Sequence, residues 1–160
     1  MKNFKDKVVV ITGAGSGMGR SYALMFANLG SKIALCDYDE KGLKETEKLV
    51  MQASNVQVYA ETLDVSDKAG VYAFAQAVKA ALGNAHVIIN NAGVTGEGRP
   101  VWALSDDSYE RVMGINFWGV VHGTRAFLPQ LLDNGEGAVV NVSSIFGLVG
   151  TPSNSDYCAS

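Results

Sequence analysis

Short apolar segments alternate with longer amphipathic segments along the whole chain. The apolar segments are rich in Val and Ile, and most are continuous, as in strands that helices cover on both faces. This order is typical of a parallel sheet built from strand–helix–strand units. We therefore expect one α/β domain over residues 1–160, with a doubly wound parallel sheet. Five strands are expected: Lys7–Thr12, Lys32–Asp37, Val56–Ala60, His86–Asn90 and Ala138–Ser143.

The amphipathic segments between these strands predict helices. Apolar residues recur at helical spacing from Met18 to Leu29, and Gly30 follows them as a left-handed cap. A weaker pattern from Leu43 to Val50 predicts a second helix. Ser66 is expected to cap a third helix, which Gly83 ends.

A fourth helix is expected to begin at Ser105, whose side chain can cap it. Asn116, Gly119 and Gly123 lie on one face of this helix, and glycines four positions apart allow another helix to pack closely. Pro129 is expected to kink or end it, because proline cannot donate the backbone hydrogen bond.

Composition and charge narrow the class of protein. The chain has 160 residues, of which 48% are hydrophobic and 18% charged, so it carries enough apolar surface to fold. The formal net charge is −3, and the sequence lacks the basic bias of nucleic-acid-binding proteins. We therefore expect no nucleic acid as a partner. We also expect no membrane as a partner, because the first apolar run, Val8–Ile11, is too short for a signal sequence or a membrane span. A cytoplasmic location is expected.

Cysteine and histidine are scarce. Cys36 and Cys158 are too few for a disulfide scaffold, and His86 and His122 do not complete a zinc-binding spacing. We expect no metal site and no reactive role for either cysteine.

The loop after the first expected strand is unusually rich in glycine. Residues Thr12 to Gly19 read T-G-A-G-S-G-M-G, and they lie between a strand and a helix. Such a loop lets backbone amides and the positive end of the helix dipole hold a pyrophosphate. It departs from the common G-x-G-x-x-G pattern, so taken alone it is also compatible with a simple tight turn. The cofactor-binding residues expected in this loop are Gly13, Ser16, Gly17, Met18 and Gly19.

Asp37 ends the second expected strand and makes the cofactor hypothesis more specific. A carboxylate at this position can accept hydrogen bonds from both ribose hydroxyls and repels a 2′-phosphate. Neither Ser16 nor Tyr38 supplies a positive charge that would bind such a phosphate. NAD(H) is therefore expected in preference to NADP(H).

Further motifs resemble the short-chain dehydrogenase/reductase family. They are Asn90-Asn91-Ala92-Gly93 and Asn141-Val142-Ser143-Ser144, followed by Tyr157, and the family's T-G-x-x-x-G-x-G motif is present at Thr12–Gly19. The resemblance covers the whole chain and implies a Rossmann-like fold. It implies that Asp64 and Val65 contact adenine, that Asn91 and Gly93 wall the nucleotide site, and that Asn90 braces the sheet by bonding to backbone.

The same resemblance implies a catalytic set that acts on a small alcohol or ketone. The family's serine precedes its tyrosine by thirteen positions, which selects Ser144 with Tyr157, and its helix asparagine falls on Asn116. Tyr157 is expected to exchange a proton with the substrate oxygen, which Ser144 holds. Lowering a tyrosine pKa from about 10 to neutrality requires roughly 4 kcal/mol, which the family obtains from a lysine and the oxidised nicotinamide. Asn116 is expected to carry a water chain to that lysine.

The sequence stops one position before the family's lysine would follow Tyr157 in Y-x-x-x-K. We therefore expect an N-terminal portion of a longer domain, with the C-terminal part of the fold missing and little activity alone. The full-length protein is expected to form a homo-oligomer, a dimer or tetramer. Alternatives are an NAD(H)-binding module without turnover and a methyltransferase on a related sheet. Taken singly, Ser144 as a loop cap, Tyr157 as a packing residue and Asn116 as a helix-bonding residue are equally ordinary interpretations.

Overall fold

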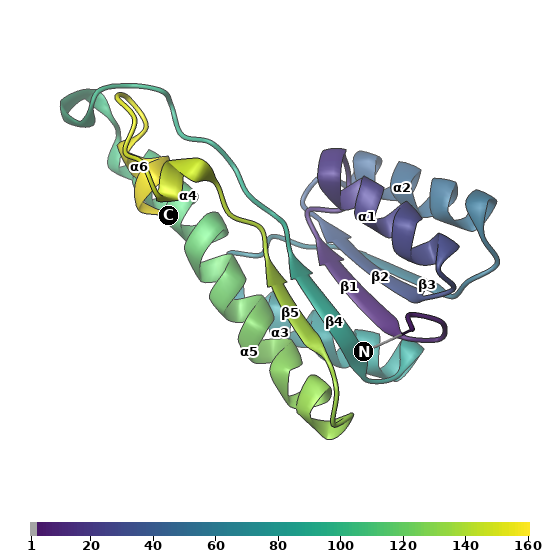
Figure 1. Cartoon of the computed structure of the whole chain (residues 1–160). Helices are drawn as coiled ribbons and strands as arrows, with labels where there is room; N and C mark the ends of the chain where they lie inside the picture. Colours follow the sequence, from purple (N-terminus) through teal and green to yellow (C-terminus); the bar gives the residue numbers. More distant parts are fainter. Residues whose placement is uncertain (1–2) are drawn as a thin grey trace.

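The computed structural model describes residues 3–160 and is built around one five-stranded parallel sheet (Figure 1). The strands follow the order β3-β2-β1-β4-β5, so the chain reverses its direction of winding between β1 and β4. In doubly wound sheets such a reversal opens a crevice at the carboxyl ends of the strands. The strands are β1 (Val8–Thr12), β2 (Lys32–Asp37), β3 (Val58–Thr62), β4 (Ala85–Asn90) and β5 (Ala138–Asn141).

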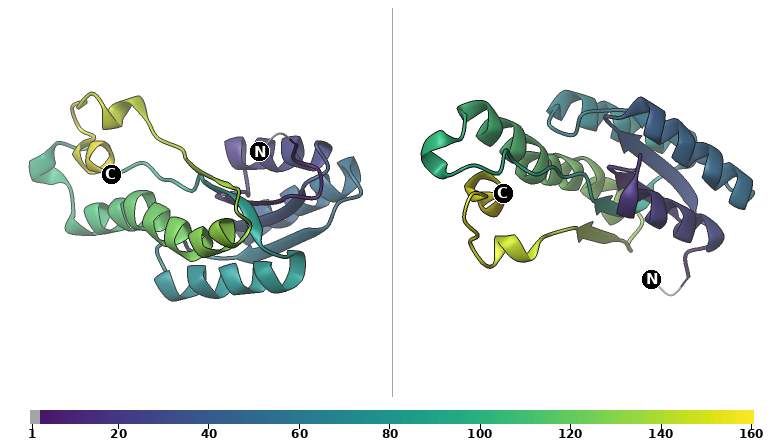
Figure 2. Two further views of the ribbon diagram at one scale, coloured as in Figure 1. Left: turned by 60° about the horizontal axis from the view of Figure 1, so that its bottom comes forward. Right: turned by 90° about the horizontal axis from the view of Figure 1, so that it is seen from above.

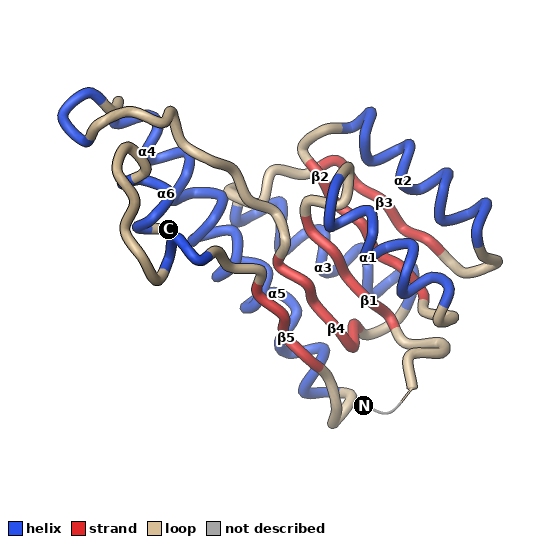
Figure 3. Tube along the Cα trace, turned by 45° about the horizontal axis from the view of Figure 1, so that its top comes forward, coloured by secondary structure: helices blue, strands red, loops and turns tan. Residues whose placement is uncertain are grey.

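Helices cover both faces of the sheet, which explains why its central strands are continuous apolar runs (Figures 2 and 3). Val9 and Ile11 of β1 pack in one core with α1 and α2, whereas Val8 and Val10 pack in a second core with α3 and α5. The helices are α1 (Gly17–Asn28), α2 (Glu40–Ala53), α3 (Lys68–Leu82) and α5 (Gly119–Asp133).

Two further helices lie beyond the carboxyl ends of the strands, where the connections after β4 and β5 run (Figure 1). They are α4 (Asp106–Met113) and the short α6 (Ser155–Ala159), which contact one another. Ser105 caps α4, as expected, by accepting a hydrogen bond from the Ser108 amide. Within residues 3–160 no helix combines the length and the apolar character that crossing a bilayer requires.

The third strand begins and ends two residues later than the expected Val56–Ala60. Its pairing with β2 runs in register until Thr62 lies opposite Asp37. The expected strand ended at Ala60 because Glu61 and Thr62 are polar. The expectation was wrong because β3 is an edge strand, and edge strands tolerate polar side chains. β5 is shorter than expected and ends at Asn141, although the Val142 amide still donates to the Asn90 carbonyl at 3.0 Å.

The cap of α3 also differs from the expectation. Asp67, and not Ser66, caps the helix by accepting from the Ala69 amide at 3.0 Å. The Ser66 hydroxyl instead donates to Asp64 at 2.7 Å, so it belongs to the turn before the helix. Gly83 ends α3 with a φ of 93°, and Gly30 follows α1 with a φ of 79°, as expected.

The single helix expected after Ser105 is interrupted. A π-helical turn at Gly114–Trp118 separates α4 from α5, and π turns frequently occur at functional sites. Pro129 lies inside α5, which continues to Asp133, so the expected end at the proline is wrong. The turn after Pro129 is held by Gln130, which donates to the Ala75 carbonyl and accepts from the Ala85 amide, both at 2.9 Å.

The glycine face of α5 packs within the chain and not against a second helix. A Cβ at Gly119 would lie 2.7 Å from the Val65 side chain. A Cβ at Gly123 would collide with the Asn90 side-chain oxygen. The expectation that this face is open for a partner helix is therefore wrong, since the loop after β3 and the end of β4 occupy it.

Candidate active site

A cavity of about 730 Å³ lies at the carboxyl ends of β1 to β4. It extends from the glycine loop, past the end of β2, to the loop after β3 and the last turn of α4. Nine of the ten residues expected to contact a cofactor line it: Gly13, Ser16, Gly17, Met18, Asp37, Asp64, Val65, Asn91 and Gly93.

The tenth residue, Gly19, lies behind the cavity wall. It is buried, and a Cβ there would collide with the Gly13 carbonyl oxygen and approach the Asn91 amide nitrogen to 2.8 Å. Gly19 therefore permits the first turn of α1 to lie against the loop and does not line the cavity itself.

The glycine loop presents the start of α1 to the cavity. Gly13 and Gly17 have φ values of 65° and 50°, in the left-handed region that favours glycine. Ser16 occupies the N-cap position, but its side chain makes no capping hydrogen bond, and no acidic residue lies in the first turn. The backbone donors at this helix end are thus available to an anion.

Thr12 and Asn91 lock the loop to the end of β4. The Thr12 hydroxyl accepts hydrogen bonds from the amides of Asn91 and Ala92, each at 3.0 Å. The Asn91 side-chain amide donates to the carbonyls of Thr12 at 2.9 Å and Gly13 at 3.0 Å. Sequence reasoning quoted Thr12 only as the start of a motif, and its position directly before the loop was the available signal.

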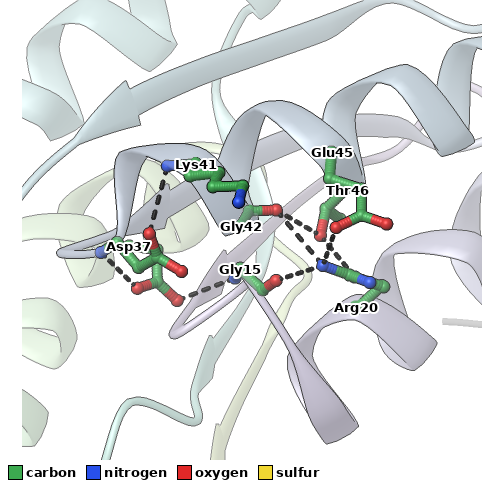
Figure 4. A network of polar contacts seen from close by, with 8 residues as sticks. Gly15, Arg20, Asp37, Lys41, Gly42, Glu45 and Thr46 are labelled. Carbon is green, nitrogen blue, oxygen red and sulfur yellow. Dashed lines mark hydrogen bonds and ion pairs between the residues drawn. The ribbon is translucent and has the colours of Figure 1, made fainter.

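Asp37 lines the cavity at the end of β2. Figure 4 shows the hydrogen bonds that hold its carboxylate. One carboxylate oxygen accepts from the Gly15 amide at 2.7 Å, and the other accepts from the Asp39 amide at 2.8 Å. The side chain is only partly buried. Each oxygen keeps a further lone pair, so the oriented carboxylate can still accept hydrogen bonds from a ligand.

Arg20 lies on the other side of Gly15 from Asp37 and ties α1 to α2 (Figure 4). Its guanidinium donates to the Gly15 carbonyl at 2.5 Å and to the Thr46 hydroxyl at 2.9 Å, and it pairs with Glu45 at 3.3 Å. Arg20 is not among the site residues expected from the sequence, so the sequence did not predict this network. The hydrogen bonds of Nε and of one terminal nitrogen of Arg20 are thus made within the protein.

The loop after β3 forms the opposite wall. Asp64 is held by the amide and hydroxyl of Ser66, at 2.9 and 2.7 Å. Val65 is buried, and its carbonyl lies 3.2 Å from Nδ1 of His122 on α5, which must therefore donate. These bonds fix a small, partly apolar surface next to the cavity, which suits a flat aromatic ring.

A second cavity of about 510 Å³ adjoins the first and brings the three expected catalytic residues together. Both cavities are lined by Met18, Asn91 and Gly93, so they meet at the glycine loop and the end of β4. The second cavity is also lined by Asn116, Ser144 and Tyr157.

Asn116 projects from the π-helical turn and joins three segments. Its side-chain oxygen accepts from the Val94 amide at 2.9 Å, and its side-chain amide donates to the Val94 carbonyl at 3.0 Å. The same amide donates to the Ser160 hydroxyl at 2.9 Å. Asn116 thus links α4 and α5 to the loop after β4 and to the end of α6.

Ser144 follows β5, and Tyr157 lies in α6. The Ser144 hydroxyl accepts from the Phe146 amide at 3.2 Å, so it caps the short turn Ile145–Gly147, and it still lines the cavity. The ring of Tyr157 packs edge-on against Phe146, with centroids 6.1 Å apart. Phe146 therefore connects the serine turn to the tyrosine.

A fully buried carboxylate lies beside Tyr157. Asp156 accepts from the Ser108 hydroxyl at 2.7 Å and from the Tyr157 amide at 2.9 Å. A Cβ at Gly96 would collide with this carboxylate, so the chain passes it closely. Next to it, the hydroxyls of Tyr109 and Ser155 are 2.7 Å apart. Sequence reasoning did not identify Asp156.

Asn90 braces the sheet. It does so through hydrogen bonds to other side chains, whereas hydrogen bonds to backbone were expected. Its amide donates to the hydroxyl of Thr124 on α5 at 3.1 Å and to the Asn141 side-chain oxygen on β5 at 2.8 Å. The expectation was wrong because the carboxyl ends of β4 and β5 place these two asparagines side by side.

The two cysteines differ in their surroundings. Cys36 is fully buried in β2, and this burial raises the pKa of its thiol well above the ordinary value. Cys158 is partly buried, and the Thr151 amide lies 3.5 Å from its sulfur. In the part of the chain that the structure describes, no group of three His, Cys, Asp or Glu side chains is placed to hold a metal.

Sequence comparison relates the chain to enzymes. Residues 7–160 match the family model described as short chain dehydrogenase. A Mycobacterium tuberculosis protein named SadH, whose name describes it as an oxidoreductase, is 45% identical over 159 residues. Human epidermal retinol dehydrogenase 2 is 42% identical over the same length. Both alignments cover 99% of this chain, but only 57% and 51% of those relatives.

Solved structures share the arrangement closely. A short chain dehydrogenase/reductase from Burkholderia phymatum, in complex with NAD, superposes with a TM-score of 0.94 and 42% identity. NAD⁺-bound xylitol dehydrogenase superposes with a TM-score of 0.94 and 32% identity. In each case 99% of this chain is covered, together with 56% and 60% of the other chain.

Proposed function

Because the chain belongs to the short-chain dehydrogenase family, a family of oxidoreductases, we propose that it binds NAD(H) and carries part of the catalytic site for interconverting a secondary alcohol and a ketone. One observation carries the proposal. The cavity at the glycine loop shares the wall residues Met18, Asn91 and Gly93 with the cavity that Asn116, Ser144 and Tyr157 line. A dinucleotide in the first cavity would therefore extend toward these side chains.

The residues of the first cavity fit a dinucleotide. The uncapped start of α1 suits the pyrophosphate, the carboxylate of Asp37 suits a ribose, and the wall formed by Asp64 and Val65 suits adenine. The relatives from Burkholderia phymatum and the xylitol dehydrogenase were each crystallised with this cofactor, which supports the assignment. When bound, the nicotinamide accepts or donates the hydride.

Asp37 supports NAD(H) over NADP(H). Its carboxylate is held by backbone amides at the cavity wall, where a 2′-phosphate on the adenosine ribose would meet like charge. Arg20, which is tied to Gly15, Thr46 and Glu45, is not among the residues that line the cavity.

The chain's own residues divide the work at the reacting oxygen. Tyr157 exchanges the proton, and Ser144 donates a hydrogen bond that holds the oxygen in place. Asn116 fixes the loop after β4 relative to the end of α6 through its hydrogen bonds to Val94 and Ser160. In the expected role it also carries water toward a cation that raises the acidity of Tyr157.

We also propose that the protein is a homo-oligomer. Because the glycine face of α5 is buried within the chain, the partner would meet the outer surface of the helix. Apolar side chains are exposed on the π-helical turn, namely Phe117 and Trp118, and on α5, namely Leu128 and Leu132. Light scattering of the natural protein should give a dimer or tetramer mass, and a stable monomer would contradict the proposal.

The test uses the natural protein, incubated with NAD⁺ and a panel of secondary alcohols while NADH absorbance is followed. Tyr157→Phe should lower the rate at least about 100-fold, because the group that transfers the proton is lost. NADH affinity should stay unchanged. Tyr72→Phe is the matched control, because it is the same substitution at an exposed side chain on α3, and it should keep full activity.

Two results would count against the proposal, and they differ. Full activity of Tyr157→Phe would remove Tyr157 from the proton step. Tight NADH binding with no alcohol oxidation by the natural protein would instead identify a binding module without turnover.

A further inference from the structure

The cavity assigned to the cofactor has an unfavourable balance of charge for its ligand. Its lining includes three carboxylates, those of Asp37, Asp64 and Glu110. Within residues 3–160, its lining includes one positively charged side chain, Arg111. A dinucleotide brings a negatively charged pyrophosphate into this space. The single cation should therefore contribute more to the binding affinity than it would in a site lined by several cations.

Arg111 is placed where its charge is available. It lies in the last turn of α4, lines the same cavity as the glycine loop, and is exposed. Its guanidinium makes a long contact of 3.5 Å to the Thr95 carbonyl. In the described part of the chain it has no ion-pair partner within 4.0 Å, in contrast to Arg20, which pairs with Glu45. Most of its donors are therefore free for a ligand.

A purely structural role accounts for only part of this guanidinium, because the contact to the Thr95 carbonyl uses one of its five N–H donors. A cation near a helix C-terminus stabilises the helix dipole, and any outward direction would serve that purpose. The Arg111 side chain also lines the cavity, together with Ile115 of the following π-helical turn.

We propose that Arg111 is a cofactor-binding residue whose guanidinium supplies the positive charge that retains the pyrophosphate of NAD(H) against the three carboxylates. This proposal rests on the proposed function and adds to it a residue on α4, outside the glycine loop and the β-strand ends. Guanidinium groups suit phosphate because their paired donors match its oxygens.

The test measures binding of two probes to the protein by calorimetry, namely ADP-ribose, which carries the pyrophosphate, and adenosine, which does not. Arg111→Met should weaken ADP-ribose binding about fivefold to tenfold at low salt, and less at high salt, because screening reduces the charge effect. Adenosine binding should change less than about twofold. Arg111→Lys should retain most of the ADP-ribose affinity.

Arg125→Met is the matched control, since Arg125 is exposed on α5 and lines neither cavity. It should leave both affinities unchanged. If the Met variant unfolds, Arg111→Gln takes its place, because it also removes the charge. It should weaken ADP-ribose binding about fivefold to tenfold at low salt and change adenosine binding less than about twofold, and unchanged ADP-ribose binding would overturn the role of Arg111.

The failures are distinguishable. A wild-type protein that does not bind ADP-ribose overturns the proposed cofactor site itself. A wild-type protein that binds ADP-ribose, with Arg111→Met binding it equally well or losing adenosine in parallel, overturns the role of Arg111 and leaves the cofactor site standing.

Discussion

Asp37 shows how one carboxylate is prepared for a ligand by the backbone around it. The amides of Gly15 and Asp39 orient its two oxygens, and the glycine at position 15 leaves no room for a side chain, since a Cβ there would lie 2.9 Å from the carboxylate. The residue thus couples the glycine loop to the end of β2. Its charge, and not only its shape, is expected to select between cofactors.

Replacing Asp37→Ala together with Tyr38→Arg should move the ratio of NADPH to NADH affinity by at least about tenfold toward NADPH. The change removes the repelling carboxylate and adds a cation at an exposed neighbour. Asp37→Asn is the matched control, because it keeps the shape and loses the charge, and it should give an intermediate ratio. Calorimetric titration with both cofactors measures this, and an unchanged ratio would contradict the role of Asp37.

His86 predicts a pH dependence of stability. Its Nδ1 accepts from the Val8 amide at 3.2 Å, and burial, followed by the charge of Lys7, lowers its pKa from 6.5. The unfolded chain therefore takes up a proton near pH 6.5, before the folded chain does. The free energy of unfolding should fall as pH decreases from about 7.5 toward 5.5, and it should be constant above that window.

Denaturant unfolding at several pH values checks this, with His86→Gln as the control. Glutamine can still accept from the Val8 amide but does not titrate, so the variant should lose this part of the pH dependence. An identical slope in both proteins would show that other groups cause it.

At the scale of elements, α4 acts as the support for α6. The buried Asp156 bonds to Ser108 of α4, and the Tyr109 and Ser155 hydroxyls meet beside it. α6 has only five residues and cannot be stable alone. The position of Tyr157 therefore depends on these contacts.

Asp156→Ala should lower the local stability of α6 by about 1–3 kcal/mol, because it leaves the Ser108 hydroxyl without its acceptor. Hydrogen exchange should show faster exchange of the α6 amides, with the amides of β1 unchanged. Asp156→Asn keeps an acceptor oxygen and should have a smaller effect. Protection equal to wild type in Asp156→Ala would contradict the supporting role.

The sequence predicts helices and strands well where the local hydrophobic pattern determines their limits. It predicts them less well where tertiary contacts determine those limits. Continuous apolar runs such as β1 were placed to within one residue. The polar end of β3 at Thr62, the choice of Asp67 over Ser66 as a cap, and the π-helical turn at Gly114–Trp118 depend on neighbours far along the chain. The continuation of α5 past Pro129 to Asp133 likewise rules out only the expected end of the helix there.

The candidate site follows a similar rule. Motif positions such as Asp37 and Ser144 line the two cavities. The roles of Arg20, Asp156 and Arg111 depend instead on residues that lie far away in the sequence and become neighbours only in the folded chain. No local spacing signals such contacts.

For the whole molecule, the two edges of the sheet differ. The β3 edge carries Glu61, which accepts from the Tyr59 hydroxyl at 2.6 Å, and charge discourages pairing with another strand. The β5 edge exposes Val139 and Val140, with 37% and 42% of their surface accessible. An open apolar edge of this kind favours association.

The polypeptide of residues 1–160 should therefore self-associate as its concentration rises, and Val140→Lys should reduce this. Light scattering over a concentration series measures it. Val101→Lys, at an exposed position outside the sheet, is the matched control and should not reduce association. Equal association of the Val140→Lys and wild-type proteins would show that the contact lies elsewhere.

The most direct test of the dinucleotide site is an amide NMR spectrum of the protein titrated with NADH. The largest shift changes should fall at four places that are far apart in sequence but share one cavity: Gly13–Met18, Asp37–Tyr38, Asp64–Ser66 and Asn91–Val94. Saturable changes confined to these segments would establish the site. Changes centred on other residues, or none at millimolar NADH, would contradict it.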